Sequence, residues 1–169
     1  LGDTELSTLW VRNEDRLRLT AGVSLFVPTG KFDAVRQTNL QSNPGFGDFY
    51  TVRPGATASY NLDPKERITV AGRVAYGFNT VNKDTSYKSG NFIYAEGGIV
   101  KVSGDFAFGF NVFSIQHVNG RYKTMGGGPF ISYKLPGQDM ALNFHISNNF
   151  QGENAIVVKS YQLRLIRAF

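Results

Sequence analysis

The feature that most constrains this chain is a two-residue alternation of apolar and polar side chains along most of its length. Between residues 16 and 28 the odd positions are apolar and the even positions are polar or small, with Phe26 as the exception. The same alternation recurs at residues 49–62 and 67–79. A period of two is typical of β-strands, and a dozen residues exceeds the five or six of an average strand. The pattern therefore predicts long strands with one apolar face.

Six further strands complete a prediction of nine. They are expected at residues 6–12, 91–102, 106–112, 124–135, 140–147 and 156–169. Short turns at 13–15, 63–66, 103–105 and 136–139 alternate with longer polar loops at 31–48, 81–90, 119–123 and 151–154. This asymmetry is typical of outer-membrane barrels, with short periplasmic turns and long outer loops. The sequence predicts an all-β, antiparallel up-and-down transmembrane β-barrel, with residues 1–169 forming a single domain.

The sizes of the side chains indicate which face should meet lipid. The apolar sets contain many of the 14 Phe and 8 Tyr, whereas the polar sets are rich in Gly, Ala, Ser, Thr and Asn. Small residues suit the limited interior of a barrel, and Tyr at the strand ends suits a bilayer interface. No run approaches the roughly 20 apolar residues of a membrane-spanning helix. Two alternatives stay open: a soluble or periplasmic β-barrel carrier of an apolar ligand, and a small plugged barrel with a structural or adhesive role.

The last predicted strand carries a further indication. Tyr161, Leu163 and Leu165 alternate with polar residues, and the strand ends in Phe169. A terminal Phe on an amphipathic strand resembles the assembly signal of outer-membrane proteins, from which Arg167 departs because that position is usually apolar. We therefore expect recognition by the outer-membrane assembly machinery.

Three stretches together resemble one family, the outer-membrane channels known as phenol meta-pathway degradation transporters. They are residues 26–33 (FVPTGKFD), residues 78–90 (FNTVNKDTSYKSG) and the strand that follows, where Glu96 occupies a position usually given to an acid facing the lumen. The resemblance implies a bacterial outer-membrane barrel of about twelve strands that passes small apolar or aromatic molecules. Single-chain bacterial barrels have an even number of strands. We therefore expect either that N-terminal strands are missing or that the segment before Asn13 does not cross the membrane, and the resemblance favours the first.

A polar set on the inward face is the predicted permeation site. Such side chains fix the selectivity of a pore by their summed field. The excess of Arg predicts a positive lumen, or a neutral one if missing strands bring acids; an Arg–Glu ladder that only stiffens the barrel is an equal alternative. The predicted lumen-lining residues are Arg18, Arg53, Arg67, Arg73, Asn79, Glu96, Asn111, Gln116, Lys134, His145 and Arg164.

Enzymatic and metal chemistry is not predicted. His145, Ser147 and Asn149 share one strand face, but such neighbours lie roughly 6–7 Å apart, too far for a hydrolytic triad. The two His are distant in sequence, so no metal is expected, and no cofactor is implied. The net charge of +5 is divided between loops and an inner wall, which argues against nucleic acid. The expected partners are outer-membrane lipid and lipopolysaccharide and a small-molecule permeant that diffuses passively, through a mouth shaped by loops 31–48 and 81–90.

Overall fold

The computed structural model describes residues 3–31, 33, 48–63, 67–82, 84–86, 88–119, 122–155, 157 and 159–167. The predicted mouth loop at 31–48 falls largely outside these residues, and so does Phe169 of the predicted assembly signal. Within the described residues, no helix is long and apolar enough to cross a membrane.

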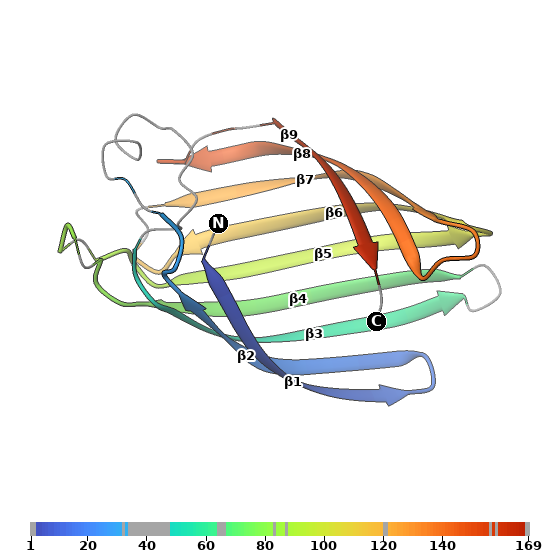
Figure 1. The fold of residues 1–169 in the computed structure, drawn as a ribbon, viewed down its shortest axis with the longest axis horizontal. Coiled ribbons are helices and arrows are strands. Elements are labelled where there is room, and N and C mark those ends of the chain that lie inside the picture. The colour runs from blue at the N-terminus through green and yellow to red at the C-terminus, as the bar shows by residue number, and fades with distance from the viewer. Residues whose placement is uncertain are drawn as a thin grey trace.

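The described chain forms one antiparallel sheet of nine strands, joined in sequence order (Figure 1). This confirms the predicted all-β, up-and-down fold class. The strands are β1 (Thr4–Glu14), β2 (Leu17–Val27), β3 (Thr51–Asp63), β4 (Ile68–Asn79), β5 (Phe92–Ser103), β6 (Phe106–His117), β7 (Lys123–Lys134), β8 (Met140–Glu153) and β9 (Lys159–Arg167).

The sheet is curled but not closed among the described residues, since β1 and β9 each have only one neighbour. Figure 1 shows both edge strands turned toward the viewer, in front of the middle strands. Because the strand number is odd and every pairing is antiparallel, β1 and β9 run in the same direction. A direct hydrogen-bonded seam between them would therefore be parallel.

Three of the predicted short turns, at 13–15, 103–105 and 136–139, lie at one end of the sheet, which we call the short-turn end. Asp15, Gly104 and Gly137 have φ values of 42°, 58° and 70°, in the left-handed region that Gly and Asp tolerate best. The strand ends that face each other in the pairs β2 and β3, β4 and β5, β6 and β7, and β8 and β9 lie at the other end, the long-loop end. Turn residues that can be recognised in the sequence thus fix where three of the hairpins reverse.

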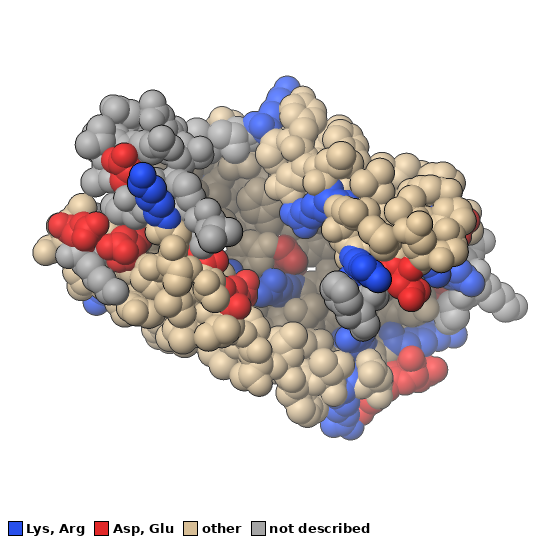
Figure 2. Space-filling view, in the orientation of Figure 1, with Lys and Arg blue, Asp and Glu red and all other residues tan. Residues whose placement is uncertain are grey.

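The two faces of the sheet differ in the way that the alternation predicts. The convex face carries bulky apolar residues such as Val74, Phe108 and Leu163, and the concave face carries residues such as Arg53 and Glu96. The Phe108 residue is 48% exposed, whereas the Arg53 side chain is only 22% exposed. Figure 2 shows that the curled sheet is hollowed in its middle, with basic and acidic side chains at the bottom of the hollow. The sheet therefore turns charge inward and hydrocarbon outward.

The buried residues of the described chain do not form an apolar core between layers. Only Phe49, Ala75 and Phe92 are buried apolar residues there, and more polar residues than apolar ones are buried. A soluble domain of this size would bury many of its bulky side chains. In this sheet they are exposed instead.

Candidate permeation surface on the concave face

Three aromatic rings on the concave face lie over glycines of the neighbouring strand. The register partners are Gly77 with Phe92, Gly109 with Phe130, and Gly126 with Phe113. A Cβ atom placed on Gly109 would lie 2.1 Å from the Phe130 ring, so only glycine admits that ring in this position. The glycines therefore let large rings rest against the wall of the hollow. Sequence reasoning missed these inward rings because it assigned aromatic side chains to the outer face.

A second group on this face joins β1, β2 and β3. Arg53 Nη2 donates a hydrogen bond to Glu5 Oε1 over 3.1 Å, and the Arg53 guanidinium carbon lies 4.3 Å from the centre of the Phe26 ring. Phe26 is the exception to the alternation in its strand, and its place under the guanidinium accounts for it. Glu5 was absent from the predicted set, and only its register with Phe26 shows that it faces inward.

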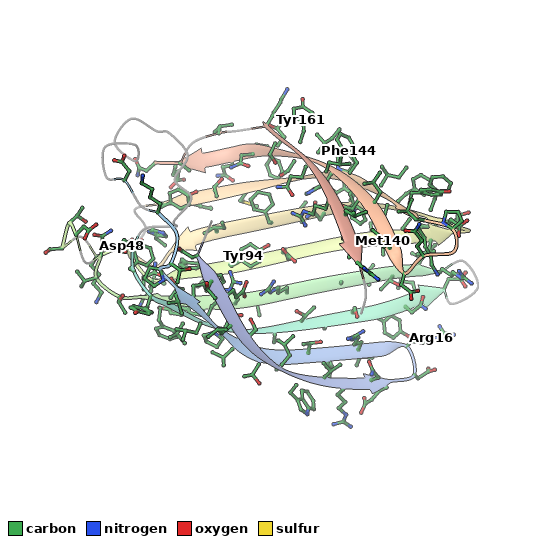
Figure 3. All side chains as sticks on the ribbon, viewed as in Figure 1. Arg16, Asp48, Tyr94, Met140, Phe144 and Tyr161 are labelled. Carbon is green, nitrogen blue, oxygen red and sulfur yellow. The ribbon has the colours of Figure 1, made fainter. Side chains whose placement is uncertain are left out.

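A third group lies in the middle of the sheet. Arg73 and Glu96 are register partners on β4 and β5, and the Tyr94 hydroxyl donates to Glu96 Oε2. The Arg73 guanidinium carbon lies 5.8 Å from the centre of the Tyr94 ring, within the range of a cation–π contact. Figure 3 shows Tyr94 over the middle strands. With Arg53 and Glu5, this part of the surface carries two positive and two negative side chains.

The glycine run at residues 126–128 allows a bridge across β7. His145 Nε2 of β8 lies 3.0 Å from Asn111 Oδ1 of β6. Gly128 of the intervening strand pairs with Asn111, and a Cβ atom there would lie 1.9 Å from the carbonyl oxygen of Ile146. The His145 ring also meets the Phe130 ring edge-on, with their centres 6.3 Å apart. The absence of a side chain at Gly128 thus lets β6 and β8 share one polar contact.

Other predicted residues lie toward the two ends of the sheet. Arg67 and Lys134 line a hollow of about 580 Å³ at the short-turn end, together with Asp105 and Asp139. Arg18 is exposed near the start of β2, on the concave side of the sheet. Arg164 is also on this side, in β9, and donates to the Gln162 side chain. The predicted set is therefore spread along the surface in groups and is not gathered into one site.

One predicted residue lies on the opposite face from the one expected, and another lies on the concave side but is buried. Gln116 pairs with Ile93 and Lys123 and shares the even positions of β6 with Phe108 and Phe110, so it lies on the convex face. Its inclusion among inward residues is corrected by this register. Asn79 is buried at the long-loop end, where it accepts from the Thr51 hydroxyl (2.8 Å) and donates to the Gly90 carbonyl (3.1 Å). These bonds tie three segments of chain together.

The family-like segment at residues 78–90 contains a compact turn organised by Asn82. The Asn82 Oδ1 atom accepts from the backbone N–H groups of Asp84 (2.9 Å) and Thr85 (2.7 Å) and from the Thr85 hydroxyl (2.9 Å). Val81 and Lys88 form an isolated bridge across it. The nearby connection between β6 and β7 carries Tyr122, whose ring centre is 5.1 Å from that of His117. Burial raises the pKa of the Tyr122 phenol above its ordinary value.

The predicted assembly residues that the structure describes all lie on the convex face of β9. Tyr161, Leu163 and Leu165 are among the most exposed apolar side chains of the described chain. In Figure 3, Tyr161 projects from the rim of the sheet. They form an apolar stripe along an edge strand.

The geometry defines an all-β, up-and-down sheet protein with a charged concave surface and an apolar convex one. The family model described as "Putative MetA-pathway of phenol degradation" matches residues 1–165, so the chain belongs to this family. This match confirms the resemblance found in the sequence. No curated protein matches the chain.

Proposed function

We propose that this protein is a bacterial outer-membrane channel for the passive uptake of small apolar or aromatic molecules. The observation that carries the proposal is that the convex face of the sheet is apolar and exposed, whereas charged side chains lie on the concave face. Phe108 is more exposed than Arg53, and bulky apolar side chains cover the convex face. Lipid tails would cover such a surface, and water would fill the hollow around the charged groups.

The chemistry of the permeant is supported by the family and by the concave surface together. The family description refers to phenol degradation. The hollow offers the rings of Tyr94, Phe113 and Phe130 between charged groups of both signs. A surface of this kind favours small molecules with an apolar body and a polar group. No reaction and no energy source is part of the proposal.

A location in the outer membrane would also give the protein binding partners. Lys31 and Lys88 lie in connections at the long-loop end, where they would meet the phosphates of lipopolysaccharide. The exposed stripe of Tyr161, Leu163 and Leu165 is the segment that the assembly machinery would recognise during insertion.

Planar-bilayer recording tests the channel directly. The purified protein, inserted from detergent, is expected to give stable ion currents, and without detergent it should aggregate. A protein that stays monomeric in buffer and passes no current would contradict the proposal and favour a soluble carrier. A protein that needs detergent but passes no current would indicate a plugged barrel.

A further inference from the structure

A small hollow in the middle of the concave face has the features of a binding site. Its volume is about 200 Å³, and its lining includes Ala71, Arg73, Gly98, Asn111 and Phe130. An apolar cavity of about 150 Å³ holds one benzene molecule. The hollow therefore has room for a single six-membered ring with a small substituent.

The walls suit a flat ring. Ala71 and Gly98 are register partners on β4 and β5, and together they give a floor with almost no side-chain volume. The Phe130 ring rises beside this floor and is held from behind by its glycine partner, Gly109, and at its edge by His145. A planar apolar ligand can contact both the floor and the Phe130 ring.

The polar groups at the rim of the hollow differ in how many hydrogen bonds they make to the described residues. Glu96 accepts from the Tyr94 hydroxyl, and Asn111 Oδ1 is in contact with His145. The Arg73 guanidinium carbon lies 5.8 Å from the centre of the Tyr94 ring, and over the described ranges of the chain the guanidinium makes no hydrogen bond or ion pair. A guanidinium carries five N–H donors. The hollow thus presents unused donors beside an apolar floor.

We propose that this hollow is a binding site for a single aromatic ring that bears one oxygen acceptor, the ring lying on Ala71 and Gly98 and the oxygen accepting from Arg73. The proposal rests on the proposed function, because it places this binding site on the path that the permeant takes through the channel. It adds a chemical preference: the same ring without an oxygen binds more weakly.

The test is a binding measurement on the whole protein in lipid nanodiscs by fluorine NMR. The probes are 4-fluorophenol and 4-fluorotoluene, which differ mainly in the oxygen. The fluorophenol is expected to bind the unmodified protein more tightly than the fluorotoluene. Arg73→Gln should weaken fluorophenol binding about tenfold, the usual effect of losing one hydrogen bond to a charged donor, and leave fluorotoluene binding unchanged.

Two further variants separate the site from the rest of the surface. Ala71→Phe fills the hollow and should abolish binding of both probes at the site, whereas Arg16→Gln removes an exposed guanidinium in the turn between β1 and β2 and should change nothing. Equal binding of the two probes, or equal effects of Arg73→Gln and Arg16→Gln, would overturn the proposal. Arg73→Lys retains a charged donor, and binding that recovers in this variant excludes a general loss of structure.

The outcome is distinguishable from failure of the channel itself. A protein that conducts ions in bilayers but does not prefer fluorophenol is a channel without this site. A protein that binds fluorophenol through Arg73 but passes no ions has the site without the channel.

Discussion

At the scale of single residues, the concave face depends on glycines whose role is set by their partners across the sheet. Gly77, Gly109 and Gly126 each accommodate an aromatic ring, whereas Gly72 and Gly97 of the same sheet meet only ordinary van der Waals contacts. The rings in turn define the walls of the hollow. Whether a glycine tolerates replacement by a larger residue therefore depends on the residue opposite to it in the sheet and not on strand propensity.

We predict that Gly109→Ala destabilises the protein by about 1–3 kcal/mol, the usual cost of overpacking, because the new methyl group would collide with the Phe130 ring. The matched control is Gly97→Ala, where the nearest atom, the carbonyl oxygen of Ala71, lies 3.6 Å from the new Cβ. Urea unfolding in lipid vesicles measures both. A Gly109→Ala protein as stable as the Gly97→Ala protein would show that the ring does not occupy this position.

At the scale of strands, two neighbouring residues of one strand should differ in how well they tolerate substitution by a charged residue. Phe110 lies on the convex face of β6 and Asn111 on the concave face. We predict that Phe110→Arg reduces folding stability in vesicles by about 2–4 kcal/mol, since the charge would face hydrocarbon. Asn111→Arg faces water and should cost much less. Equal tolerance of the two substitutions would argue that the convex face does not meet lipid.

The connection between β4 and β5 makes a separate prediction. Asn82→Ala removes the acceptor for three hydrogen bonds, so the turn should open more often and trypsin should cleave after Lys88 several times faster. Asn82→Asp keeps an acceptor oxygen in the same place and serves as the control. If cleavage is equally fast in the unmodified protein and in Asn82→Ala, then Asn82 does not hold this turn.

Strand positions were predictable from the sequence because alternation and turn residues are local signals. The turns at Asp15, Gly104 and Gly137 come directly from residues that tolerate positive φ. The face of Phe130 was not predicted and that of Gln116 was predicted wrongly, since a side chain's face follows from strand register and from what lies opposite. The inward place of Glu5 was missed for the same reason. Sequence reasoning thus predicted the strands and most of the charged residues of the concave face, but not the aromatic rings that line the hollow.

At the scale of the whole molecule, one sheet carries two contrasting surfaces. Its convex surface is bulky and apolar, and its concave surface combines charges of both signs with rings set over glycines. The described sheet is open, with β1 and β9 running in the same direction. An antiparallel closure requires an even number of strands, and the total of about twelve that the family resemblance implies remains a prediction.

The single Trp of the chain gives the most direct measurement of which surface meets lipid. Trp10 pairs with Ala21 on the convex face and is 56% exposed. In vesicles containing brominated acyl chains, its fluorescence should be strongly quenched, and aqueous iodide should have little effect. Strong quenching by iodide with none by brominated lipid would place the convex face in water and contradict the account.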